Sequence, residues 1–265
     1  MIKLIATDMD GTLLDEDKNI PQGFFEMLNK LKEKGVAFVV ASGRSYVTLY
    51  ENFKPHSDSI DFICDNGAFV VINGGITNLD IINPEKVREI INLCAGMESI
   101  RLLLCGVKGT YHLSSDEEFD EHIKAYYINR KIEKDLLDVK DDIFKIAICD
   151  LKGPENNSFP KLYEAFGEEL ALQISGSYWM DVMNKGVSKG KALKKIQENL
   201  GVSYDETMAF GDFYNDIELL KRAKYSFVME NANDDMFQYG NYRAKSNKES
   251  GVLKAIEEFV FEKGL

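Results

Sequence analysis

The sequence has 265 residues, of which 45% are hydrophobic and 29% are charged, and its 32 basic and 44 acidic side chains give a net charge of −12. This length can hold one large domain or two modest ones, and the composition is ordinary for a soluble globular protein. The sequence is acidic and shows no cluster of basic residues that could bind a phosphate backbone, so nucleic acid is not expected as a partner. No uncharged run is long enough to cross a bilayer, so a membrane is not expected as a partner either.

The first third of the chain alternates apolar strands with amphipathic helices. A helix with Phe24, Leu28 and Leu31 on one face is predicted to end at Gly35, and a second helix is predicted after Arg44. The inner side of this second helix is predicted to carry Tyr46, Val47 and Tyr50. Strands are predicted over residues 2–7, 36–41, 62–64 and 68–72, the last in a hairpin. Because these strands are almost wholly apolar, we expect a parallel sheet covered on both faces.

The middle of the chain, residues 81–184, has its own strand and helix pattern. Helices are predicted over 84–94, 116–129 and 159–166, and strands over 100–105, 143–149, 170–175 and 178–183. The first pattern then resumes, with helices over 189–200, 215–223 and 252–259 and strands over 207–210 and 226–229. The sequence therefore predicts an α/β core domain of residues 1–80 and 185–265, interrupted by a second α/β domain of residues 81–184.

The end of the first strand carries two carboxylates two residues apart, Asp8 and Asp10, followed by Gly11. Residues i and i+2 of an extended chain point the same way, so both side chains can face one small volume. Such a pair repels itself unless a proton or cation lies between them, and Mg²⁺ is the natural partner. An ordinary Asp-Gly turn is the simpler alternative. A helix-loop-helix calcium site is excluded, because its first ligand position would fall on Ala6, after a strand.

Four polar segments follow predicted strands or begin predicted helices, where ligands of open α/β sheets bind. They resemble the four motifs of the haloacid dehalogenase-like phosphatases, and most closely the Cof-type subgroup with a large α/β cap (type IIB). The resemblance implies a Rossmann-like parallel sheet core, the haloacid dehalogenase fold, with residues 81–184 as the inserted cap. The segments are Asp8-Met9-Asp10-Gly11-Thr12-Leu13-Leu14, Ala41-Ser42-Gly43-Arg44, Gly186-Val187-Ser188-Lys189-Gly190 and Gly211-Asp212-Phe213-Tyr214-Asn215-Asp216, with Asp65-Asn66-Gly67-Ala68 and Ser250-Gly251-Val252 as further matches.

The resemblance implies a catalytic role for each acidic residue. Asp8 is the expected nucleophile, which forms an aspartyl-phosphate. Asp10 is the expected general acid and then the base that activates water, and a crowded acidic site would keep it protonated before attack. Asp8, the backbone carbonyl of Asp10 and Asp212 are expected to bind Mg²⁺, with Asp216 supporting this metal site from behind the direct ligands.

The resemblance also assigns the residues that hold the phosphate. The backbone N–H groups of Met9 and Gly43 and the Ser42 hydroxyl are expected to bind the phosphoryl oxygens, together with Lys189 as a full charge and Asn215 as a neutral donor. Lys189 could instead be a solvated helix lysine, although its place in the motif favours the site. Substrate contacts are assigned to Arg44 and Asn66, which could equally be a surface cation and a turn residue. Residues near the end of the cap could line its cavity or belong to its core, namely Tyr178, Trp179 and Asp181.

These expectations combine into one function, a Mg²⁺-dependent phosphatase for small phosphorylated metabolites, plausibly sugar phosphates. A phosphomutase is the alternative enzyme, because the aspartyl-phosphate can return its phosphoryl group to a sugar. A non-catalytic metabolite-binding or regulatory protein on the same scaffold is the alternative outside enzymes. The four cysteines form no Cys-x-x-Cys pair and the N-terminus lacks a signal-peptide pattern, so the cytoplasm is expected. No obligate protein partner is indicated.

Overall fold

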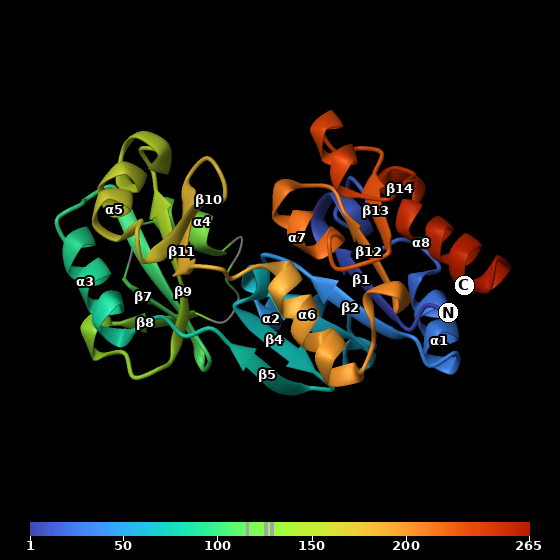
Figure 1. Cartoon of the computed structure of the whole chain (residues 1–265). Coiled ribbons are helices and arrows are strands. Elements are labelled where there is room, and N and C mark those ends of the chain that lie inside the picture. The colour runs from blue at the N-terminus through green and yellow to red at the C-terminus, as the bar shows by residue number, and fades with distance from the viewer. Residues whose placement is uncertain (115–116, 125–126, 128–129) are drawn as a thin grey trace. The chain divides into compact units, whose positions relative to one another are not determined.

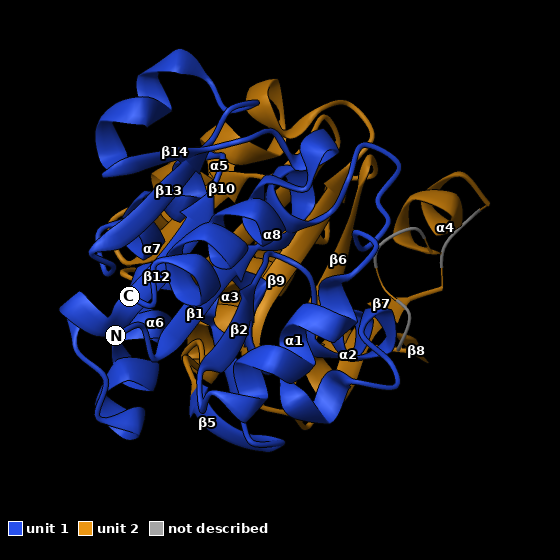
Figure 2. Cartoon of the chain, turned by 90° about the vertical axis from the view of Figure 1, so that its right-hand side faces the viewer, with its two compact units in different colours: residues 1–78, 188–265 blue, residues 79–187 orange. Residues whose placement is uncertain are grey.

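The computed structural model describes residues 1–114, 117–124, 127 and 130–265. The chain divides into two compact units, Met1–Asn78 with Ser188–Leu265, and Leu79–Val187 (Figure 2). The first unit is therefore assembled from two stretches that are distant in sequence, and the second unit is an insertion between them.

The first unit contains an eight-stranded sheet in the order β14-β13-β12-β1-β2-β3-β4-β5 (Figure 1). The strands from β14 to β3 pair in parallel, and β4 is antiparallel to β3. Strand β1 lies between β2 and β12, so the two halves of the unit meet at it. The bounds are β1 Leu4–Asp8, β2 Ala37–Ala41, β3 Asp61–Cys64, β4 Phe69–Ile72, β5 Gly75–Leu79, β12 Thr207–Gly211, β13 Tyr225–Met229 and β14 Tyr242–Ala244.

Helices cover both faces of this sheet. On one face, Leu193 and Ile196 of α6 and Leu219 of α7 pack against small and branched side chains of the strands. On the other face, the rings of Phe24 in α1 and Phe38 in β2 pack edge to face with centroids 5.4 Å apart. The bounds are α1 Phe24–Glu33, α2 Tyr46–Asn52, α6 Lys189–Leu200, α7 Ile217–Leu220 and α8 Gly251–Ile256. The expected parallel sheet with two covered faces is therefore confirmed.

Two predicted helix faces have different outcomes. The buried face of α1 carries Phe24, Leu28 and Leu31, as expected. In α2 the buried residue is Leu49, whereas Val47 is exposed, so the prediction for Val47 is wrong. Because α2 begins at Tyr46, its inward stripe falls at positions i and i+3, and Val47 lies outside that stripe.

The described residues of the second unit form a six-stranded sheet in the order β10-β11-β9-β6-β7-β8. Helices α3 and α5 pack on one face through a cluster that includes Ile90, Leu162 and Ile148. The expected helix over residues 116–129 lies partly outside the described residues, and α4 covers its described part. The bounds are α3 Pro84–Cys94, α4 Glu117–Lys124, α5 Ser158–Phe166, β6 Ile100–Gly106, β7 Gly109–Leu113, β8 Arg130–Glu133, β9 Ile143–Asp150, β10 Leu170–Ile174 and β11 Trp179–Asn184.

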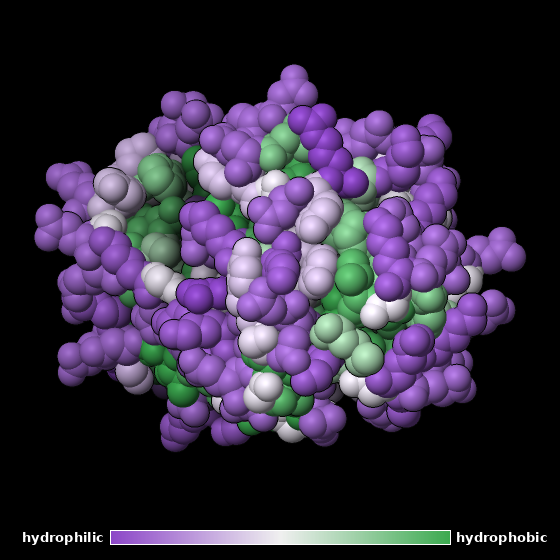
Figure 3. Space-filling view, turned by 45° about the vertical axis from the view of Figure 1, so that its right-hand side comes forward, coloured by the Kyte–Doolittle hydropathy of each residue, from purple (hydrophilic) through white to green (hydrophobic). Residues whose placement is uncertain are grey.

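The surface agrees with the charged composition. On the face seen in Figure 3, hydrophilic side chains cover most of the surface and hydrophobic areas are small and separated. Among the described residues, no helix combines the length and the apolar character that a membrane span requires.

Candidate active site

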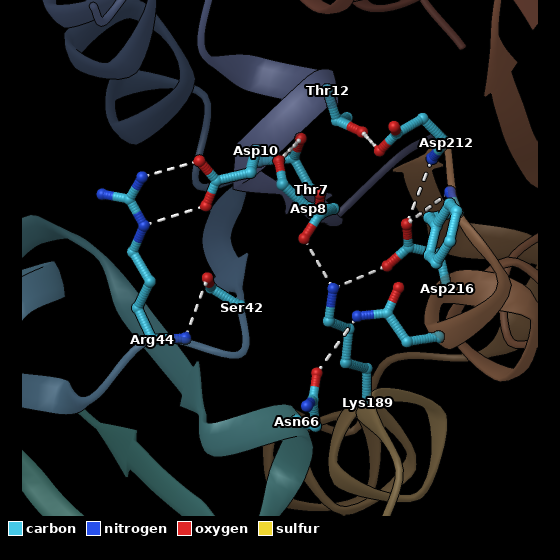
Figure 4. A network of polar contacts seen from close by, with 12 residues as sticks. Thr7, Asp8, Asp10, Thr12, Ser42, Arg44, Asn66, Lys189, Asp212 and Asp216 are labelled. Carbon is cyan, nitrogen blue, oxygen red and sulfur yellow. Dashed lines mark hydrogen bonds and ion pairs between the residues drawn. The ribbon is translucent and has the colours of Figure 1, made fainter. Parts of the chain in front are cut away.

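The polar side chains of the first unit gather where its parallel strands end (Figure 4). Asp8 is the last residue of β1, Ser42 follows β2 and Asp212 follows β12. The chain leaves β1 towards β2 on one side and returns through β12 on the other, which is the switch point where open α/β sheets bind ligands.

Lys189 joins two buried carboxylates at this point. Its ammonium Nζ donates to Oδ1 of Asp8 over 2.5 Å and to Oδ1 of Asp216 over 2.7 Å. Lys189 and Asp216 are fully buried and Asp8 is only 6% exposed. A solvated helix lysine is therefore ruled out, because the first residue of α6 points into the sheet edge and not into water.

The electrostatics of this cluster are dominated by burial. Burial, followed by the nearby charge of Asp216, raises the pKa of the Asp8 carboxyl well above its ordinary value, although Lys189 opposes the shift. Burial alone would lower the pKa of Lys189, but the charges of Asp216 and Asp8 outweigh it and raise that pKa. Lys189 is therefore held as a cation beside two acidic side chains, and further positive charge nearby would favour the ionised form of Asp8.

Asp212 completes an acidic cluster that fits a hard divalent cation. Carboxylate oxygens of Asp8, Asp212 and Asp216 lie within 4.8 Å of one another. Thr12 Oγ1 donates to Asp212 Oδ1 over 2.8 Å and orients that carboxylate. Burial, and then the charge of Asp216, raise the pKa of Asp212 to about 6. Converging oxygen ligands with excess negative charge are the donor set that Mg²⁺ prefers, so the residues fit this ion.

Two glycines permit the close approach of backbones around the cluster. Gly11 has φ +81°, and a Cβ atom there would overlap the Asp212 carboxylate. Gly190 follows Lys189 in α6, and a Cβ atom there would overlap the backbone carbonyl of Glu218 in α7. The glycines of two motifs therefore set the distance between elements that carry the acidic side chains.

The Asp10 side chain departs from two expectations. Strand β1 ends at Asp8, and the chain then turns sharply at Gly11, which has φ +81°. The segment Met9–Leu13 is therefore irregular, and the alternation of the strand does not fix the direction of Asp10. Its carboxylate points to Arg44 and not to the acidic cluster (Figure 4). Burial raises the pKa of Asp10, but hydrogen bonds from Arg44 and Lys18 outweigh this and lower it. The acidic cluster therefore does not favour a proton on Asp10 in this arrangement, and protonation of Asp10 before attack stays a prediction.

The remaining predicted residues lie at the same sheet edge. The Ser42 hydroxyl is 2% exposed and accepts the backbone N–H of Arg44 over 3.2 Å. Asn215 Nδ2 donates to Asn66 Oδ1 over 3.1 Å, so the structure brings these two asparagines together. Met9 directly follows the last residue of β1, and Gly43 is the second residue after the end of β2.

Three polar contacts at the site were not expected from the sequence. Lys18 Nζ donates to Asp10 Oδ1 over 2.8 Å. Asn231 Nδ2 donates to the Gly11 carbonyl and Asn247 Nδ2 to the Leu14 carbonyl, each over 2.8 Å, so they hold the middle and the far end of the turn after Asp8. Asn247 lies just before the Ser250-Gly251-Val252 match, which is the only sequence signal near it.

Comparison with known proteins agrees with this geometry. The model of the haloacid dehalogenase-like hydrolases matches residues 5–256. The 5-amino-6-(5-phospho-D-ribitylamino)uracil phosphatase YbjI of Escherichia coli (strain K12) is 32% identical over 267 residues, which cover 98% of this chain and 96% of that protein. The 5-amino-6-(5-phospho-D-ribitylamino)uracil phosphatase YcsE of Bacillus subtilis (strain 168) is 28% identical over 260 residues, with 98% and 96% covered.

A solved structure shows the same similarity over the whole chain. The crystal structure of SMU.1108c from Streptococcus mutans UA159 matches with a TM-score of 0.85 at 30% identity, covering 98% of this chain and 99% of that one. The family match spans both halves of the first unit and the insertion between them. The chain therefore belongs to the haloacid dehalogenase-like hydrolases, in their Cof-type phosphatase subgroup, and is a phosphoric monoester hydrolase.

Proposed function

We propose that this phosphatase depends on Mg²⁺ and hydrolyses small phosphorylated metabolites, sugar phosphates among them, through an aspartyl-phosphate on Asp8. The observation that carries the proposal is the buried cluster in which Lys189 Nζ contacts Asp8 over 2.5 Å and Asp216 over 2.7 Å, with Asp212 beside them. A carboxylate fixed by a buried cation at a sheet edge is suited to act as a nucleophile.

Asp8 takes the phosphoryl group in the first half of the reaction. Lys189 holds Asp8 by Oδ1, and we assign the attack on phosphorus to Oδ2. As the new bond to phosphorus forms, the bond from phosphorus to the leaving oxygen breaks. Lys189 and Asn215, the Ser42 hydroxyl and the backbone N–H groups of Met9 and Gly43 then bind the phosphoryl oxygens.

The metal site comprises Asp8, Asp212 and the backbone carbonyl of Asp10. Asp216 supports it by accepting the backbone N–H groups of Asp212 over 3.1 Å and Phe213 over 3.2 Å. Bound Mg²⁺ supplies positive charge that offsets the repulsion between the carboxylates and the arriving phosphate.

Asp10 carries the protons of both half-reactions. It rests as a carboxylate between Arg44 and Lys18. A phosphate dianion beside it raises its affinity for a proton, so we place proton uptake at substrate binding. Asp10 then protonates the leaving oxygen and takes a proton from the water that attacks the aspartyl-phosphate. Over one cycle the proton that it gives is replaced by the proton of water.

The insertion is proposed to be the cap that chooses among substrates, with residues 81–184 as its extent and 1–80 with 185–265 as the catalytic core. Two relatives are named for a phosphate ester on a ribityl chain, which supports sugar or sugar-alcohol phosphates as substrates. The four cysteines are buried and form no Cys-x-x-Cys pair, which supports a reducing compartment, the cytoplasm, as the place where the enzyme works.

The test is hydrolysis of a panel of phosphomonoesters with and without Mg²⁺. The panel includes 5-amino-6-(5-phospho-D-ribitylamino)uracil, hexose phosphates and p-nitrophenyl phosphate. We expect turnover only with Mg²⁺, and the Asp8→Asn variant should abolish it because an amide cannot attack phosphorus. Turnover retained by Asp8→Asn would reject the mechanism. Phosphorus NMR of the products separates free phosphate from an isomerised sugar phosphate, which would indicate a mutase.

A further inference from the structure

Asp10 is held by two cations from different loops. Arg44 forms a two-pronged contact, with Nη2 2.6 Å from Oδ1 and Nε 2.8 Å from Oδ2. Lys18 Nζ adds a third hydrogen bond to Oδ1 over 2.8 Å. We refer to Arg44 and Lys18 together as the cation clamp.

The clamp gives the two carboxylate oxygens of Asp10 different numbers of hydrogen bonds. A carboxylate has about four acceptor positions, two on each oxygen. Among the described residues, Oδ1 accepts two hydrogen bonds and Oδ2 accepts one. One acceptor position therefore remains, and it is on Oδ2. Asp10 can bind a proton there without losing either cation.

Lys18 reaches Asp10 from a backbone that is itself constrained. It has φ +65°, a left-handed conformation that is unfavourable for a residue other than glycine. Asp15 stabilises this conformation, because its Oδ1 accepts the backbone N–H groups of Asp17 over 2.9 Å and Asn19 over 2.8 Å. A strained residue that contacts a reacting group is a reason to look for a role in the reaction.

Arg44 is fixed from the other side of the site. Its backbone N–H donates to the Ser42 hydroxyl, and its carbonyl accepts the N–H of Asp65 over 3.0 Å. The guanidinium is therefore oriented by the same loop that carries Ser42. Its two prongs fix the plane of the Asp10 carboxylate, which a point charge cannot do.

We propose that Arg44 and Lys18 are positioning residues that make Oδ2 of Asp10 the atom of proton transfer. This inference rests on the proposed function. When the bond from phosphorus to the leaving group breaks, its electron pair stays on the leaving oxygen, which takes the proton from Oδ2. The charge left on Asp10 is held by the clamp. When water attacks the aspartyl-phosphate, the bond from phosphorus to Asp8 breaks and the proton of water moves to Oδ2.

The test is the dependence of kcat/KM on the leaving group. For a two-step phosphatase kcat/KM reports the first half-reaction, in which the leaving oxygen is protonated. Alkyl phosphates need that proton, whereas p-nitrophenyl phosphate leaves without it. We expect Arg44→Ala to lower kcat/KM about 100-fold for alkyl phosphates and less than about fivefold for p-nitrophenyl phosphate. A plot of log kcat/KM against leaving-group pKa should therefore become steeper.

Conservative variants separate the two roles in the clamp. Arg44→Lys keeps the charge but loses the two-pronged contact, so it should behave like Arg44→Ala. Lys18→Arg should keep the slope of the wild type, whereas Lys18→Met should steepen it less than Arg44→Ala does. Added guanidinium should restore part of the alkyl phosphatase activity of Arg44→Ala. Lys3→Met is the matched control, because Lys3 is an exposed lysine paired with Glu206 and not with Asp10.

Two results would overturn the inference. One is an equal loss for all leaving groups in Arg44→Ala, which indicates a structural role. The other is a rise in KM alone at unchanged kcat and slope, which indicates a substrate contact. Lys18 has a side chain 65% exposed, so its variants should fold even where Arg44 variants do not. These outcomes leave the proposed function standing, whereas an active Asp8→Asn variant would remove that function whatever the slope.

Discussion

At the scale of single residues, Lys189 shows that attraction to nearby carboxylates outweighs the effect of burial in the site. Its ammonium is fully buried, and burial without a partner would favour loss of the proton. Two carboxylates at 2.5 and 2.7 Å reverse that tendency. Burying the three charged groups costs free energy that their attraction largely offsets, so the pairs chiefly fix the positions of the side chains. Replacing one partner would leave the other charge buried and unpaired.

The raised pKa of Asp212 predicts how the Mg²⁺ requirement depends on pH. Its pKa is raised to about 6, chiefly by burial and then by Asp216. In the proposed metal site the Asp212 carboxylate binds Mg²⁺, so a proton on Asp212 would compete with the metal. We expect the Mg²⁺ concentration for half-maximal activity to rise below pH 6, by up to about tenfold per pH unit. The stability of the metal-free protein should change in the opposite direction. Because the pKa of Asp212 is raised on folding, the free energy of unfolding should increase as the pH falls from about 6 towards 4.

Mg²⁺ titrations between pH 5 and 8 check this expectation. Asp205→Asn is a suitable control, because Asp205 is an exposed acid paired with Lys224. Asp205→Asn should leave the pH dependence of the half-maximal Mg²⁺ concentration unchanged. In Asp212→Asn the half-maximal Mg²⁺ concentration should vary less with pH than in the wild type. A half-maximal Mg²⁺ concentration that stays constant from pH 5 to 8 in the wild type would contradict the assignment of Asp212.

The sequence identifies some of these residues and not others, for a physical reason. Asp8 and Asp212 follow apolar strands, and parallel strands bring their carboxyl ends together, so their meeting could be predicted. The direction of the Asp10 side chain could not be predicted, because it depends on where β1 ends and on the sharp turn that follows at Gly11. Lys18 gave no signal at all, since its contact arises from a left-handed backbone held by Asp15.

At the scale of elements, helix α6 has a glycine at each end, Gly190 in its first turn and Gly201 directly after its last residue. A Cβ atom at Gly190 would overlap the Glu218 carbonyl, whereas nothing lies within 4 Å of one at Gly201. Gly190→Ala should push α6 from α7 and displace Lys189, with a fall in kcat of at least about tenfold. Gly201 has φ +63°, so Gly201→Ala should cost about 1–2 kcal/mol of stability with unchanged kcat.

Urea unfolding and steady-state kinetics of both variants test this prediction. The comparison matters because both substitutions should destabilise the protein, and overpacking at Gly190 is expected to cost about 1–3 kcal/mol. If the two variants lose similar stability and both keep full kcat, then the contact between α6 and α7 does not position Lys189.

Element types were predictable where the apolar pattern was continuous. Strands β1, β2 and β9 are buried along their whole length or nearly so, and each corresponds to a run of mostly apolar residues in the sequence. Strands β8 and β14 have exposed residues and no such run, and they were missed. Their position at the sheet edges explains the weak pattern, because an edge strand is paired on one side only.

At the scale of the whole molecule, the proposed metal site and the tryptophan lie in different units. The chain has one tryptophan, Trp179, which is buried in β11 of the second unit. Asp8, Asp212 and Asp216 all belong to the first unit. A ligand stabilises the part that binds it, by about 2.7 kcal/mol at a hundred times its Kd. Saturating Mg²⁺ should therefore raise the Tm of the first unit by roughly 5–10 °C.

Calorimetry and tryptophan fluorescence test this together. Calorimetry should show one transition that moves with Mg²⁺, while the midpoint of the Trp179 fluorescence change stays where it was. A fluorescence midpoint that rises in step with the calorimetric one would mean that the two units unfold as a single cooperative structure.

The place of β1 in its sheet has a consequence for synthesis on the ribosome. One of its two neighbours, β12, is encoded some two hundred residues later, as the contact between Thr12 and Asp212 illustrates. At about 5–20 residues per second, the growing polypeptide waits roughly 10–40 s with that apolar edge unpaired. Nascent chains are therefore most prone to aggregate during this interval, and catalytic competence can arrive only after β12 and Asp212 have been synthesised.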